Sequence, residues 1–243
     1  MQPPAIHRHL SLANLAKKLS PPAATEPKRD PVDALAAMLD LRGSVRVSEV
    51  AAGIDPPVVT DGRAEPALLE EVERGVLAIL EEVPKAFVSL RRPGRVLRAL
   101  RAESDPEASA KALVERFDEA MVRSILRARG DLRTLREDVG TKLRNAGPRA
   151  AALERLDAAL AEAMRVATAA RLSALVPLAI EAFERVATEK VVAAGEGIDL
   201  AKVEAWCRPD GWLLRAVTDG EAAALAIARF EAKPLLALAE AAV

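Results

Sequence analysis

The sequence has no tyrosine, one cysteine, two histidines and few aromatic residues, with four Phe and two Trp in 243 residues. One cysteine cannot form an internal disulfide, and with two histidines it supplies too few ligands for a structural zinc site. His7 and His9 are two residues apart, which places them on different faces of a helix. We therefore expect no metal, no cofactor and a reducing, cytoplasmic setting.

Long apolar runs are also missing. The most apolar stretch, between Arg171 and Glu181, has about half of the ~20 residues that a membrane-spanning helix needs. Near the N-terminus, Lys17 and Lys18 follow a short mixed segment, which is unlike a cleaved signal peptide. We expect a soluble protein without a transmembrane segment.

The residues that are abundant favour helices. The chain is 51% hydrophobic and 29% charged, and its apolar residues are mostly Ala, Leu and Val, a composition typical of long helices that pack through small side chains. The net charge of -1 gives no global attraction for nucleic acid or an anionic membrane. The sequence predicts an all-α protein.

The central region predicts the dominant feature of the fold. Apolar residues recur there at steps of three and four, at Val114, Phe117, Met121, Ile125, Leu132, Leu135, Val139 and Leu143. Gly147 and Pro148 then predict a turn, and a second helical pattern follows up to residue 197. We expect a long antiparallel, coiled-coil-like hairpin, with Pro177 bending its second helix.

Smaller helical segments are expected to pack on this hairpin. Proline and glycine clusters divide the chain into an N-terminal arm with a Pro-rich linker (1–29), a small helical region (30–105), the hairpin (106–197) and a C-terminal helical segment (198–243). In the small region, a helix begins after Asp30, residues 53–66 form a loop, and another helix follows Pro66. In the last segment, Asp199 is an N-cap, and Gly220 and Pro234 weaken the final helix.

The sequence contains no recognisable catalytic constellation. Cys207 has no nearby base to activate it, because the two histidines lie about two hundred residues upstream. Adjacent carboxylates such as Glu70 and Glu71 point in different directions on a helix, which suits solvation better than acid–base catalysis. There is no Gly-rich phosphate loop, Ser-His-Asp signature or zinc motif. We expect that the protein is not an enzyme.

One segment, residues 85–101, has a strong charge of one sign. Its six cations are Lys85, Arg91, Arg92, Arg95, Arg98 and Arg101, and no acidic residue occurs before Glu103. We expect Arg91, Arg95, Arg98 and, less directly, Arg101 to share one helical face. The segment is a candidate site for an anionic partner: nucleic acid, anionic lipid or an acidic protein. No aromatic residues that could stack on bases are interleaved with these cations.

Both tryptophans flank a predicted turn, "RPDG", at 208–211. Trp206 and Trp212 can clamp a corner between two helices, or they can contact a partner. We favour the internal anchor, because buried aromatic side chains usually belong to a core.

The patterns around the turn at Gly147 also carry a family resemblance. The block "TLREDVGTKLRNAGPRAAALERLDAALAEAMRVATAARLSALVPLAIEAFERV", together with "LANLAKKL", "DPVDALAAMLDLRGSVRVSEVAAG" and "GWLLRAVTDGEAAALAIARFEAKPLLALAEA", resembles a proteobacterial family known as domain of unknown function 3348. The resemblance covers roughly two thirds of the chain. This chain departs from the family pattern in two ways. It lacks a tryptophan near "MLDLRG", and it has an additional basic segment at 85–101.

The resemblance implies a cytoplasmic, helical, non-enzymatic protein. Genes of that family often lie beside genes for membrane proteins similar to the MotA/TolQ/ExbB channels and for OmpA-like envelope proteins. We therefore expect an adaptor that binds a cytoplasmic part of such a complex, peripheral to the inner membrane. The alternative is a nucleic-acid-associated protein that uses residues 85–101. Whether the apolar seam is filled within one chain or by self-association in a homo-oligomer stays open.

Overall fold

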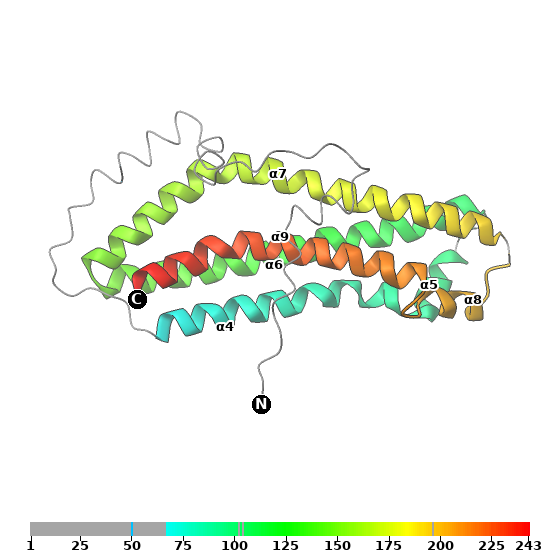
Figure 1. Cartoon of the computed structure of the whole chain (residues 1–243), viewed down its shortest axis with the longest axis horizontal. Helices are drawn as coiled ribbons and strands as arrows, with labels where there is room; N and C mark the ends of the chain where they lie inside the picture. The colour runs from blue at the N-terminus through cyan, green and yellow to red at the C-terminus, as the bar shows by residue number, and fades with distance from the viewer. Residues whose placement is uncertain (1–49, 51–66, 102, 104, 196) are drawn as a thin grey trace. The chain divides into compact units, whose positions relative to one another are not determined.

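The computed structural model describes residue 50 and residues 67–101, 103, 105–195 and 197–243, except for the side chains of 164–174. Every regular element in these ranges is a helix, which confirms the all-α prediction. The elements are α4 (Ala67–Glu82), the 3-10 helix η1 (Val83–Arg91), α5 (Pro93–Leu100), α6 (Pro106–Ala146), α7 (Pro148–Ala194), α8 (Leu200–Trp206) and α9 (Trp212–Ala242). Figure 1 colours them in this order.

Three of the sequence-based expectations fall on other residues. His7 and His9, the arm and linker at 1–29, and the helix and loop predicted between Asp30 and Pro66 lie outside the described residues. In the part of the chain that the structure does describe, no helix has the length and hydropathy required to cross a bilayer.

The long central helix predicted from the apolar spacing is present as α6. Pro106 begins it, and the Asp105 carboxylate accepts a hydrogen bond of 3.1 Å from the Ala108 N–H, which satisfies one of the free donors of the first turn. Its end at Ala146 is followed by Gly147, whose φ of 139° is a backbone conformation that residues with a Cβ rarely adopt. Pro148 then begins α7, as predicted.

Contacts between Cα atoms divide the chain into two compact units. The described part of unit 1 comprises residues 80–128 and 174–228, and that of unit 2 comprises 67–79, 129–173 and 229–243. Both units contain parts of α4, α6, α7 and α9, whereas η1, α5 and α8 belong to unit 1. This grouping follows contacts in space, and the four-part division given above follows sequence composition.

Unit 1 is organised around a series of aromatic rings. Phe117 of α6 stacks face to face on Phe183 of α7, with ring centroids 4.0 Å apart and planes within 4°. Phe87 of η1 lies against Phe117 at 6.1 Å, and Trp212 of α9 lies against Phe183 at 6.4 Å. Trp206 of α8 extends the series, 5.4 Å from Trp212. Five helical elements therefore meet through aromatic contacts, whose preferred geometries add to simple apolar burial.

Gly220 of α9 lies directly on this stack. A Cβ atom built on Gly220 would be 2.3 Å from Cζ and 2.5 Å from Cε2 of Phe117, far closer than carbon atoms can approach. The sequence suggested that Gly220 weakens α9. In the structure, the missing side chain is what allows the α9 backbone to pack against the Phe117 ring.

The apolar face of α7 in unit 1 differs from a simple leucine stripe. Its buried residues are Ala179, Phe183, Ala187 and Val191, which repeat every four positions. Leu175, Ile180 and Val186 are only partly buried. Small alanines on either side of Phe183 leave room for the Phe117 ring, because a larger side chain there would hold the two helices apart.

Unit 2 is joined by ion pairs between helices as well as by its apolar core. Arg136 of α6 binds Asp157 of α7 with hydrogen bonds of 2.7 to 3.0 Å from its Nε and Nη2 atoms. Nearer the turn, Arg144 binds Glu154 at 2.6 Å. Lys142 pairs with Glu71 of α4, so α4 and α7 both contact α6 in this unit.

The two internal prolines do not interrupt their helices. α7 continues through Pro177, and α9 continues through Pro234 as far as Ala242. We expected Pro234 to weaken the last helix by kinking or ending it, and the second of these outcomes is wrong. Leu235, Leu238 and Ala239 are buried after Pro234, and this apolar burial offsets the hydrogen bond that proline removes.

The close approach at Gly220 predicts opposite effects for two Gly→Ala substitutions. Gly220→Ala should lower the free energy of unfolding by ~1–3 kcal/mol, because the new methyl group overlaps the Phe117 ring. Gly130→Ala in α6 should raise it by ~0.5–1 kcal/mol, because its Cβ meets no atom within 4 Å and alanine favours the helix. Urea unfolding of both variants tests this, and a stabilised Gly220→Ala would contradict it.

Candidate binding surfaces

The basic segment is divided by a proline into two different elements. Lys85 and Arg91 belong to the 3-10 helix η1, whereas Arg95 and Arg98 lie on α5. Between them, Arg92 is extended, with φ −98° and ψ 106°, because the ring of Pro93 disfavours a helical conformation for the residue before it. The expectation that Arg91 shares one helical face with Arg95, Arg98 and Arg101 was therefore wrong.

The two cations of η1 are engaged within unit 1. Lys85 binds Glu82, which also pairs with Arg127 at 3.3 Å. The Lys85 hydrogen bond, opposed by a smaller desolvation effect, lowers the pKa of the Glu82 carboxyl. Arg91 binds the partly buried carboxylate of Glu221 on α9, and its Nε atom is buried without a hydrogen-bond partner. Arg91 is thus a structural link between η1 and α9.

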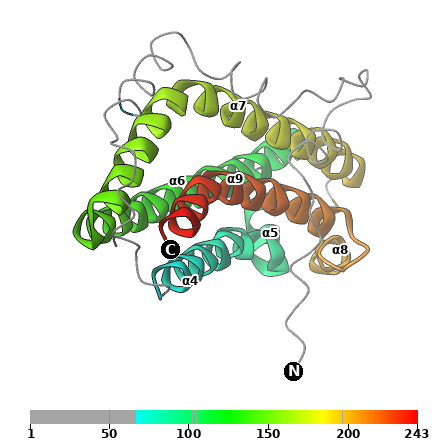
Figure 2. The ribbon, with the colours of Figure 1, turned by 60° about the vertical axis from the view of Figure 1, so that its left-hand side comes forward.

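The other four cations form an exposed surface. Val96, Ala99 and Leu100 bury the inner face of α5, and α5 packs against α8, as Figure 2 shows. At 100° per residue, Arg98 and the C-cap residue Arg101 lie opposite this buried face, and Arg95 lies at its side. Arg92 precedes them at the N-cap. We call these four exposed residues the α5 arginine surface: Arg92, Arg95, Arg98 and Arg101.

The tryptophan corner is formed as an internal contact. Asp199 caps α8 by accepting a hydrogen bond of 2.8 Å from the Lys202 N–H, as predicted. The chain then turns between Trp206 and Trp212, both of which are partly buried and in contact with each other. Trp212 also contacts Phe183, but its Nε1–H is buried without an acceptor. Both rings therefore support unit 1, and both keep some exposed surface.

Cys207 lies in this corner. It is partly buried, and desolvation raises the pKa of its thiol above the ordinary value. A raised pKa decreases the fraction of thiolate, the form that acts as a nucleophile. The surroundings of Cys207 therefore make its thiol less reactive, whereas a catalytic cysteine has a lowered pKa.

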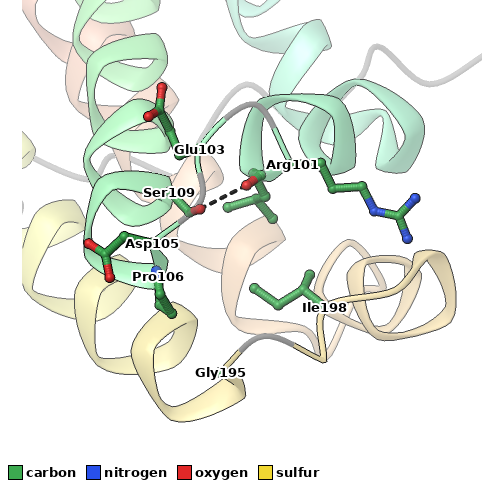
Figure 3. Close-up of a pocket in the computed structure, with 8 residues that line it drawn as sticks. Arg101, Glu103, Asp105, Pro106, Ser109, Gly195 and Ile198 are labelled. Carbon is green, nitrogen blue, oxygen red and sulfur yellow. Dashed lines mark hydrogen bonds between the residues drawn. The ribbon is translucent and has the colours of Figure 1, made fainter.

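A cavity of about 600 Å³ lies in unit 1 between the end of α5, the start of α6 and the segment before α8. Arg101, Glu103, Asp105 and Ile198 are among its lining residues. Figure 3 shows the charged ends of the first three pointing in different directions, and the Ser109 hydroxyl already donates to the Leu100 carbonyl at 2.7 Å. Small-molecule sites instead direct several polar groups toward one point. Within the described residues, no cluster of His, Cys, Asp or Glu could hold a metal.

Two apolar side chains face solvent on α6. Val122 is 42% exposed and Leu126 is 60% exposed, and they lie one turn apart. Charged residues surround them, including an ion pair of 3.6 Å between Arg123 and Glu119. We call Val122 and Leu126 the α6 apolar pair. The apolar spacing does not single out this pair, because both residues lie beside the buried stripe of Met121 and Ile125.

Comparisons with known proteins assign no family and no fold relative to this chain. No family model matches the chain, and neither the curated proteins nor the solved structures contain a match.

Trp212 should be the more informative of the two tryptophans in mutational tests. Trp212→Ala should lower the free energy of unfolding by ~3 kcal/mol, because it removes contacts with both Phe183 and Trp206. Trp212→Phe should cost less than ~1 kcal/mol, because it keeps an aromatic ring and removes the unsatisfied Nε1–H. Equal losses for the two variants, measured by chemical denaturation, would contradict an anchoring role for the ring.

Removing the charge of Arg91 should lower the free energy of unfolding much more than removing the charge of Arg95. Arg91→Met leaves the partly buried Glu221 carboxylate without its partner and should destabilise the fold by ~1–2 kcal/mol. Arg95→Met, at an exposed position, should stay within ~0.5 kcal/mol of the wild type. Adding Glu221→Gln to Arg91→Met should recover part of the loss in unfolding experiments, and strictly additive effects would count against the ion pair.

Proposed function

We propose that this protein is a non-enzymatic helical adaptor that binds a protein partner through the α6 apolar pair. The observation that carries the proposal is the exposure of Leu126, at 60%, beside Val122 on the same face of α6. Two exposed apolar side chains one turn apart provide an apolar contact on an otherwise charged helix face, which the groove of a partner can cover. The resemblance described above favours, as the partner, a cytoplasmic part of a membrane ion channel, motor or envelope complex.

The scaffold for this contact is, in our proposal, an antiparallel hairpin of α6 and α7. In unit 2, the Arg136–Asp157 and Arg144–Glu154 ion pairs join the two helices on either side of the turn at Gly147. In unit 1, the Phe117–Phe183 stack joins them again. Such contacts hold α6 rigid, so little conformational entropy of the backbone is lost when a partner binds Val122 and Leu126.

The chemical features of the described residues fit binding better than catalysis. Burial raises the pKa of the Cys207 thiol, and the charged side chains around the cavity point apart. Neither arrangement resembles a nucleophile with a base, or a cluster of groups around a reacting atom. We therefore propose that the protein binds a partner and does not catalyse a reaction.

Substitution of the α6 apolar pair tests the adaptor function. Val122→Ser/Leu126→Ser should leave the free energy of unfolding within ~0.5 kcal/mol, because both side chains are exposed. The same variant, tagged and purified gently from its own host, should lose the protein that accompanies the wild type. Quantitative mass spectrometry of the purified material measures this loss.

The chain offers a matched control with the same chemistry. Val192 and Leu200 are 42% and 45% exposed on α7 and α8, so Val192→Ser/Leu200→Ser removes similar apolar surface elsewhere in unit 1. The control should keep the partner. Equal retention by both variants would refute the assignment of the interface, and recovery that disappears with nuclease would favour the nucleic-acid alternative.

A further inference from the structure

The α5 arginine surface is separate from the α6 apolar pair and has a different chemistry. Arg92, Arg95, Arg98 and Arg101 are exposed, and none of them forms an ion pair with a carboxylate in the described residues. Arg91, which directly precedes Arg92, is instead paired with Glu221. The sequence from Val83 to Ala102 also contains no acidic residue. Four arginines that form no such ion pair, within the ten residues from 92 to 101, concentrate positive charge on this part of unit 1, and an anionic partner would neutralise it.

The surface is also well anchored. Val96 is almost fully buried, and Ala99 and Leu100 lie beside it on the inner face of α5. α8, with Val203 completely buried, packs against α5. A rigid helix fixes the Cα positions of the arginines, so that less conformational entropy is lost when a partner binds.

The spacing of the arginines suits carboxylates on a helix. Arg95, Arg98 and Arg101 cover ~9 Å along the axis of α5, at 1.5 Å per residue. Asp or Glu residues at positions i, i+3 or i+4, and i+7 of a second helix cover a similar length. All four cations of the surface are arginine, whose planar guanidinium group binds a carboxylate through two parallel hydrogen bonds.

Other anionic macromolecules fit the surface less well. The outer face of α5 has no aromatic side chain that could stack on a base, since the nearby Phe87 is fully buried. It also offers little apolar surface for insertion into a bilayer, because its exposed residues are Gly94 and arginines and its Leu97 is only partly exposed. Electrostatic attraction alone would have to hold a nucleic acid or a membrane.

From this geometry we propose that the α5 arginine surface binds an acidic protein segment whose carboxylates are at helical spacing. The proposal does not depend on the α6 apolar pair. Loss of binding at one surface leaves the other intact, so the two proposals can fail separately.

The test compares three labelled probes on the full chain. The first is an Ala-rich helical peptide with Glu at positions i, i+4 and i+7, the second is duplex DNA of 20 base pairs, and the third is a phosphatidylcholine vesicle containing phosphatidylglycerol. Fluorescence anisotropy or co-sedimentation gives the affinity of each. The peptide should bind, and its affinity should fall as salt rises.

The variant and its control remove the same charge from different places. Arg95→Gln/Arg98→Gln changes the centre of the surface and leaves the N-cap Arg92 and the cavity-lining Arg101 in place. Arg116→Gln/Arg185→Gln removes two exposed cations from α6 and α7. Peptide affinity should fall roughly tenfold or more in the first variant and change less than about twofold in the second.

Conservative variants separate recognition from folding. Arg95→Lys/Arg98→Lys keeps the charge but not the planar group, and should give an intermediate affinity. Failure of the wild type to bind the peptide, or an equal loss in the Arg116/Arg185 control, would overturn the proposal. Binding of DNA or vesicles that exceeds peptide binding and depends on Arg95 and Arg98 would also overturn it.

Discussion

The contact between the Phe117 and Phe183 rings is the constraint on which unit 1 depends. The two rings are parallel at 4.0 Å, and Gly220 lies so close to Phe117 that even a methyl group would overlap the ring. Phe87 and Trp212 extend the contact to η1 and α9. Protein interiors are packed as tightly as crystals, so a change at any of these positions would shift several helices together.

This core explains why the two candidate surfaces can be exposed and still well positioned. η1 is held by Phe87 inside and by the Arg91–Glu221 ion pair at its edge, and α5 begins at Pro93, two residues after η1 ends. On α6, the fully buried Phe117 and Met121 orient the helix so that Val122 faces outward. Buried core residues and exposed surface residues lie on the same helices. The tightly packed core residues therefore fix the positions of the exposed ones.

Much of the local structure could be predicted from sequence. Apolar spacing indicated α6, Gly147 and Pro148 indicated the turn, and Asp199 indicated the cap of α8, because each of these signals acts over a few residues. The break before Pro93 was also predictable from sequence, since the residue before a proline avoids the helical conformation. The run of positive charge does not reveal this break, since Arg91 ends η1 and the other arginines belong to α5 and its two caps.

Long-range packing could not be predicted in the same way. Five of the chain's six aromatic rings join one series, yet Phe87, Phe117 and Phe183 are far apart in sequence. Gly220 looked like a weak point because helix propensity describes a helix in isolation. The exposure of Leu126 likewise depends on which face of α6 its neighbours cover, and that information is tertiary.

The most direct test of the account is photo-cross-linking in the protein's own host, with a benzophenone amino acid placed at Leu126 and, as a control, at the similarly exposed Leu200. The account predicts a cross-link from position 126 to another protein, resistant to nuclease, with little or none from position 200. Absence of a cross-link at 126, or equal cross-linking at both positions, would contradict the claim that α6 presents a binding surface.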